Sequence, residues 1–82
     1  NEHLIIFPNP NTGSFTAEIN LQTKEKVVLK VYNSRGQLFR RFVFEAGETK
    51  KEIDTTKWSK GTYHCILEQN SKKLTWKKIV VE

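Results

Sequence analysis

The chain has 82 residues, which is enough for one small domain and excludes a large multi-domain enzyme, so we expect residues 1–82 to form a single domain. The one cysteine excludes an intrachain disulfide and a multi-cysteine zinc site, and no apolar run is long enough for a membrane-spanning helix, so we expect no direct membrane insertion. A net charge of +5 favours anionic partners, but eleven of the fourteen cationic residues are lysines, which is more typical of a solubilising surface than of a phosphate site.

Two segments near the N-terminus are expected to be strands. Residues 4–7 are apolar and end at Pro8, which cannot donate to a strand ladder. Residues 14–21 alternate strictly between apolar and polar side chains, which predicts a half-buried strand. Its predicted core face carries Phe15, Ala17, Ile19 and Leu21.

The middle of the chain predicts a hairpin. Residues 27–31 repeat the alternation, and the turn that follows ends at Gly36, where a glycine allows a left-handed backbone. The returning strand, about residues 37–45, is rich in phenylalanine but carries Arg40 and Arg41 in its middle, where we expect a bulge.

The second half of the chain predicts three further strands. Residues 48–54 are polar apart from Ile53, as an edge strand requires, and Asp54 is expected to cap a short helical turn that Gly61 ends. The next strand starts near Tyr63, and the last one covers about residues 74–81. Seven short strands without helical periodicity predict an all-β fold, a seven-stranded antiparallel immunoglobulin-like β-sandwich, with a small barrel as the main rival.

Candidate catalytic and ligand sites are few. His64 and Cys65 are adjacent in a strand and therefore point to opposite faces, so they cannot form a nucleophile–base pair, and Cys65 is expected in the core. Residues 72–78 interleave four lysines with Trp76, but a tryptophan packed on the flank beside lysines that protect an edge strand explains them better than nucleic-acid binding. We therefore expect no enzyme activity, no metal, no cofactor and no nucleic-acid partner.

Two local features indicate rigid connections. Residues 8–13 contain two prolines, which fix the backbone and lack amide donors, and end in a glycine, so we expect an ordered corner. Trp58, Gly61 and Tyr63 have the spacing of a tyrosine corner, in which the phenol bonds to backbone upstream of it.

These motifs, taken together with the last strand, resemble the C-terminal sorting domain, type A, of the type IX secretion system. The likeness spans nearly the whole chain and rests on residues 8–10 with Gly13, residues 31–33 with Gly36 and Gln37, residues 53–63 around Trp58, and the closing run of residues 77–81. The positions that the resemblance assigns to the signal are Pro8, Asn9, Pro10, Gly13, Gly36, Gly61, Tyr63, Lys77, Lys78, Ile79, Val80 and Val81.

The resemblance implies a folded address of an exported protein of the Bacteroidetes group. A fused N-terminal cargo, the type IX outer-membrane translocon and its shuttle protein are the implied partners. It also implies transit through the periplasm, delivery to the cell surface or the medium, and removal by a sortase-like cysteine peptidase.

Within this implied function, we expect residues 77–82 to carry the address. Their strand would pack one face on the core, show a basic and apolar stripe on the other, and offer an edge for pairing with a receptor. The alternative is an accessory β-sandwich that binds carbohydrate or protein, which exposed Trp58 and Trp76 on one flat surface would favour.

Overall fold

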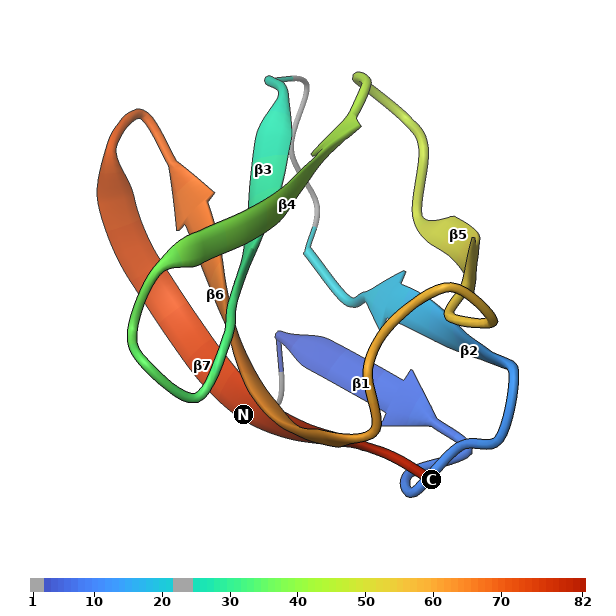
Figure 1. Ribbon diagram of the computed structural model, residues 1–82. Coiled ribbons are helices and arrows are strands. Elements are labelled where there is room, and N and C mark those ends of the chain that lie inside the picture. Colours follow the sequence, from blue (N-terminus) through green and yellow to red (C-terminus); the bar gives the residue numbers. More distant parts are fainter. Residues whose placement is uncertain (1–2, 22–24) are drawn as a thin grey trace.

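The computed structural model describes residues 3–21 and 25–82, which form seven β-strands in two facing sheets (Figure 1). The strands are β1 (Leu4–Phe7), β2 (Ser14–Ile19), β3 (Val27–Tyr32), β4 (Leu38–Phe44), β5 (Lys50–Asp54), β6 (Gly61–Gln69) and β7 (Lys72–Val81). The first sheet has the order β1-β2-β5 and the second has the order β4-β3-β6-β7. Every pairing between these strands is antiparallel. The predicted seven-stranded antiparallel sandwich is therefore confirmed, and the two separate sheets exclude the barrel.

The core lies between the sheets and follows the alternation of the strands. Every second residue of β2, β3 and β6 is buried, because successive side chains of a strand point to opposite faces. Burial of these side chains supplies the main stabilising term, at roughly 25 cal/mol for each Å² of apolar surface removed from water. The buried residues are Leu4, Phe15, Ala17, Ile19, Val27, Leu29, Val31, Phe44, Ile53, Trp58, Tyr63, Cys65, Leu67, Ile79 and Val81.

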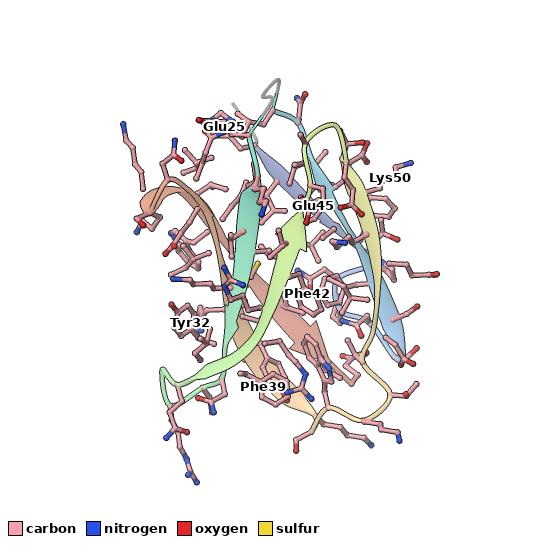
Figure 2. All side chains as sticks on the ribbon, turned by 90° about the horizontal axis from the view of Figure 1, so that it is seen from above. Glu25, Tyr32, Phe39, Phe42, Glu45 and Lys50 are labelled. Atoms are coloured by element: carbon pink, nitrogen blue, oxygen red, sulfur yellow. The ribbon has the colours of Figure 1, made fainter. Side chains whose placement is uncertain are left out.

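The bulge in β4 lies one residue before the arginine pair. Val31 pairs with Arg40 and Tyr32 pairs with Leu38, so Phe39 is the extra residue. The bulge turns the Phe39 ring toward the core, where it lies 5.1 Å from Trp58 and 5.2 Å from Tyr63 between ring centroids. Figure 2 shows Phe39 and Phe42 between the sheets and Tyr32 on the outer side.

Some predicted bounds differ from the structure: the strand predicted for residues 48–54 begins at Lys50, and the last strand, predicted from about residue 74, begins at Lys72. The strand predicted for residues 14–21 ends at Ile19, because the pairing of β2 with its two neighbours ends there. β1 pairs with β2 as far as Ile19, and β5 pairs with it as far as Glu18. Residues 22–24 lie outside the described part of the chain. The predicted cap is confirmed, because the side chain of Asp54 accepts the amide N–H of Thr56 at 2.8 Å. The segment that follows is not helical: it is a simple turn with one backbone bond, from the amide of Trp58 to the carbonyl of Thr55.

Each sheet has two edge strands, and β5 and β7 differ in what lies along their edges. The predicted edge strand β5 is polar on its outer face, and beside it Lys51 pairs with Glu48 at 3.0 Å. β7 is an edge of the four-stranded sheet and pairs with β6 along its whole length. The candidate site lies along the edge of β7 that faces away from β6.

Candidate functional site

The N-terminal corner and the last strand meet at one edge of the sandwich. Asn11 forms a parallel bridge with Val81, its amide N–H donates to the carbonyl of Val80 at 2.9 Å, and its own carbonyl accepts the amide of Glu82 at 2.8 Å. The chain therefore begins in the first sheet with β1 and, after the corner, pairs with the edge of the second sheet. Pro8 and Pro10, which follow cis peptide bonds, lack amide donors, so asparagine side chains provide part of this pairing.

Asn9 pairs with the last strand through its side chain. Its amide nitrogen donates to the carbonyl of Lys78 at 2.7 Å, and its amide oxygen accepts the N–H of Val80 at 3.0 Å. Asn9 itself is exposed, as are Pro8 and Pro10. This part of the corner can therefore be reached by a partner.

Asn11 is the buried centre of the contact, and sequence reasoning did not identify it. Its side-chain oxygen accepts the hydroxyl proton of Thr55 at 2.7 Å, and its nitrogen donates to the carbonyl of Val80 at 3.2 Å. Thr55 in turn donates its amide N–H to the carbonyl of Gly13 at 2.8 Å. The available signal was the asparagine directly after Pro10, because a short amide side chain is well suited to replace missing backbone donors.

The last strand divides its faces as predicted. Ile79 and Val81 are in the core, whereas Lys78 is exposed and Val80 half-buried on the outer face, and Lys77 is half-buried on the side of Ile79. No described residue bonds to the N–H of Lys78, but from the carbonyl of Lys78 to Glu82 the prediction of an open edge along residues 77–82 was wrong. Residues 9 and 11 cover this edge, because an exposed row of unpaired backbone groups is unfavourable unless another segment satisfies it.

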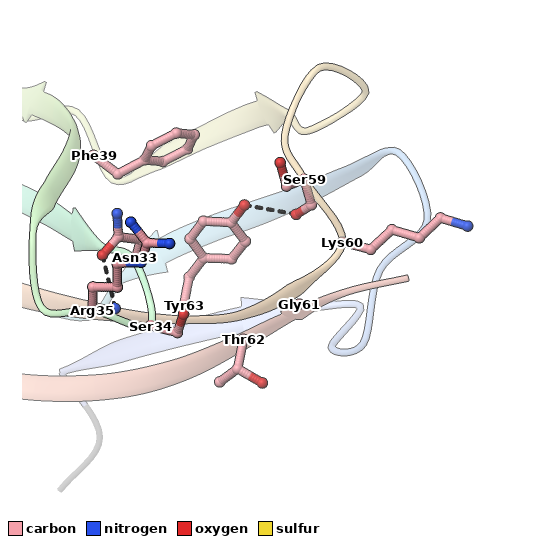
Figure 3. Close-up of a pocket in the computed structure, with 9 residues that line it drawn as sticks. All are labelled: Asn33, Ser34, Arg35, Phe39, Ser59, Lys60, Gly61, Thr62 and Tyr63. Carbon is pink, nitrogen blue, oxygen red and sulfur yellow. Dashed lines mark hydrogen bonds between the residues drawn. The ribbon is translucent and has the colours of Figure 1, made fainter.

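The tyrosine corner is confirmed at the opposite side of β6. The Tyr63 hydroxyl donates to the carbonyl of Ser59 at 2.6 Å, and Gly61 between them has φ of +144°, which a residue with a side chain rarely adopts (Figure 3). The turn before β4 lies next to it, with Gly36 at φ of +80°. Together the two turns line a hollow of about 290 Å³ formed by Asn33, Ser34, Arg35, Phe39, Ser59, Lys60, Gly61, Thr62 and Tyr63.

The predicted signal positions therefore form two groups. Pro8, Asn9, Pro10 and Gly13 lie against or beside the end of β7. Gly61 and Tyr63 line the hollow, and Gly36 directly follows its lining residues 33–35 in the chain. A family model described as the secretion system C-terminal sorting domain matches residues 5–82, which is nearly the whole chain. The chain belongs to this family of sorting domains. No curated protein matches it.

The sorting domain is thus a type IX secretion signal. A signal of this kind works with the secretion machinery and with a cargo fused on its N-terminal side, and it directs that cargo to the cell surface or out of the cell. Its side chains should therefore be considered first as recognition elements.

The one cysteine and the neighbouring histidine lie on opposite faces of β6. Cys65 lies in the core, and burial raises the pKa of its thiol from 9.0 to about 11, so at neutral pH it is a protonated, inaccessible group. His64 is exposed on the opposite face, as predicted. Within residues 3–21 and 25–82, the His, Cys, Asp and Glu side chains form no group of three or more that could hold a metal ion. The described residues also contain no helix that is long and apolar enough to span a bilayer.

The two tryptophans differ in exposure. Trp58 is in the core, 6.0 Å from Phe15 in an edge-on arrangement, so the flat surface with two tryptophans that would favour a carbohydrate-binding module is absent from the described residues. Trp76 lies on the flank of the second sheet, as expected, but remains 55% exposed there. Its ring lies 5.9 Å from that of His64 on the outer face of the second sheet.

Proposed function

We propose that this sorting domain is a non-enzymatic, folded address formed by the whole 82-residue chain, which the secretion machinery reads at the joint between residues 8–13 and the end of β7. The observation that carries this proposal is the pairing of Asn9 with Lys78 and Val80. It joins the two sequence motifs at the chain ends into one exposed site, which exists only when the domain is folded. A machinery that must reject unfolded cargo can use such a site.

The export steps in this proposal are those that the family resemblance implies. The domain folds in the periplasm, and the shuttle protein and the outer-membrane translocon bind it there. The sortase-like cysteine peptidase then removes the domain from its cargo at the cell surface. The buried Cys65, with its raised pKa, takes no part in this cleavage, because a reactive cysteine must be accessible as a thiolate.

The test is charge reversal at the joint in a fluorescent cargo that ends in this domain. Lys78→Glu changes an exposed side chain of β7, so it leaves the core intact, unlike deletion of residues 80–82, which removes the buried Val81. The matched control is Lys57→Glu, because Lys57 is also an exposed lysine and lies in the turn after β5, away from the joint. The host is one whose type IX system exports the unmodified fusion.

We expect K78E to reduce the exported fraction by at least ~10-fold, with folded protein held in the periplasm, while K57E is exported normally. Thermal unfolding of both purified variants must first match the unmodified domain. Export of folded K78E at the unmodified rate would overturn the assignment of the address to this joint.

A further inference from the structure

The first half of β7 has an open backbone edge. Val80 directs its N–H and C=O away from β6, toward residues 9 and 11. The register from Val80 to Trp76 has no shift, so the backbone groups of Trp76 point the same way, because the direction alternates with a period of two. None of the described residues bonds to the N–H or C=O of Trp76.

The chain itself shows how this edge accepts a neighbour. The side-chain amide of Asn9 carries one donor and one acceptor, as a peptide group does, and uses both on β7 at 2.7 and 3.0 Å. It therefore occupies the place that a peptide group of an added strand would occupy. The open stretch continues directly from this point to Trp76 and ends at the bulge at Leu74, where Thr75 pairs with Leu67 and Lys73 with Glu68.

The positive charge of β7 indicates which kind of strand can pair with its open edge. β7 carries Lys72, Lys73, Lys77 and Lys78 and no acidic residue. The nearest acidic residue on its partner strand, Glu68, is paired with Lys30 at 3.0 Å. A second copy of this chain would place lysines opposite lysines along the seam, which is unfavourable, whereas an acidic segment would be attracted.

An apolar anchor lies beside the open edge. Trp76 is 55% exposed and, with His64, Ile66 and Lys73, lines a shallow hollow of about 310 Å³ on the outer face of the sheet. A strand added to the edge would direct every second side chain toward this face. A large exposed aromatic of this kind is a frequent centre of binding energy.

We propose that an extended acidic segment of a partner protein adds to β7 as a further strand, bonding to the backbone of Trp76 and the N–H of Lys78 and placing an apolar side chain against Trp76. The strand-addition proposal rests on the proposed function, because the partner protein is taken to belong to the secretion machinery. The lysines of β7 then have two effects: they prevent self-association along the edge, and they attract the acidic segment.

The direct test uses a synthetic peptide of about seven residues in which glutamate alternates with valine, with a lysine–valine peptide as the control. Amide hydrogen exchange of the 15N-labelled domain is measured by NMR. We expect the acidic peptide to slow exchange of the Trp76 and Lys78 amides by at least ~10-fold, and the basic peptide to have no effect. Unchanged exchange at these two amides, including the case in which the peptide perturbs only lysine side chains, would overturn the proposal.

A pair of variants tests the anchor and separates this proposal from the proposed function. Trp76→Ala should lower the affinity of the domain for the acidic peptide by at least ~10-fold. Leu38→Ala is the matched control, because Leu38 is 54% exposed on β4, the opposite edge strand of the same sheet. In the export assay, loss of export with both W76A and K78E supports strand addition. If K78E blocks export but W76A is exported at the unmodified rate, strand addition fails while the proposed function stands.

Discussion

Single asparagine side chains make hydrogen bonds that neighbouring backbone cannot make. Asn9 and Asn11 do so beside the two prolines. Asn33 does so in the β3–β4 turn, where its side-chain oxygen accepts the amides of Arg35 and Gln37 at 2.9 and 3.0 Å. These residues fix the connections in a chain whose small core leaves little stability to spare.

Tyr63→Phe tests the tyrosine corner at this scale. The variant keeps the buried ring and loses the bond to the carbonyl of Ser59, so we expect the free energy of unfolding to fall by ~1–2 kcal/mol in urea titration. Ser59→Ala is the control, since only the backbone of Ser59 takes part, and it should change stability by less than ~0.5 kcal/mol. Equal stability of Y63F and the unmodified domain would show that the bond contributes nothing.

At the scale of the elements, the corner acts as a partial fifth strand at the edge of the second, four-stranded sheet. Asn11 bonds to Val80, Glu82 and Thr55, so it connects the corner, the last strand and the turn after β5. The position of β7 therefore depends on a segment more than sixty residues away in the chain.

Asn11→Ala tests this connection. It leaves the Thr55 hydroxyl without its acceptor in a buried place, so we expect a loss of ~2–3 kcal/mol in unfolding free energy. Asn9→Ala removes bonds at an exposed position and should cost only ~0.5–1 kcal/mol. If both variants lose the same stability, burial of Asn11 has no special role.

The turns that flank β5 should make stability depend on acid pH. The side-chain bond with Lys51 lowers the pKa of Glu48, and the side-chain bond with Thr56 lowers the pKa of Asp54. Because both are lowered in the folded state, their contribution is complete above the ordinary values of 4.5 and 3.8 and is lost as pH falls through the folded values. We expect Tm to decrease between about pH 5 and 2, and the double variant E48Q/D54N to show a flatter profile over that range.

At the scale of the whole molecule, the two sheets enclose a single cysteine that reports on opening of the sandwich. Cys65 has no solvent exposure, and its thiol contacts the carbonyl of Lys77 at 3.4 Å. Because burial raises its pKa to about 11, the thiol favours folding below pH 9.0, and this contribution is lost as pH rises toward 11.

Thiol labelling measures this enclosure. At pH 8 we expect an aromatic disulfide reagent to react with the folded domain at least ~100-fold more slowly than with the domain in denaturant, because labelling requires opening of the core. Cys65→Ala provides the blank. Complete labelling of folded protein within seconds would contradict the enclosure of Cys65 between the sheets.

Much of the fold could be predicted from alternation alone. The core faces of β2, β3 and β6 follow directly from it, because period-two patterning assigns each side chain to one face. The position of the bulge could not be predicted, since Arg40 and Arg41 interrupt the pattern and only the contacts of Phe39 with Trp58 and Tyr63 favour one register. Of the candidate site, the sequence identified Asn9 but not Asn11 or Thr55.

The sequence by itself determined the all-β class, the turns at Gly36 and Gly61, the tyrosine corner and the family, because these depend on neighbours within a few residues or on motifs in a fixed order. Only the tertiary structure decided which edge is open. Whether the backbone of β7 is paired depends on where residues 8–11 lie, and no local pattern encodes a contact between segments so far apart. The tertiary structure also decided the exposure of the two tryptophans. Trp58 is buried because the rings of Phe15, Phe39 and Tyr63 pack around it. The side chain of Trp76 points from β7 to the outer face of its sheet, where it is exposed.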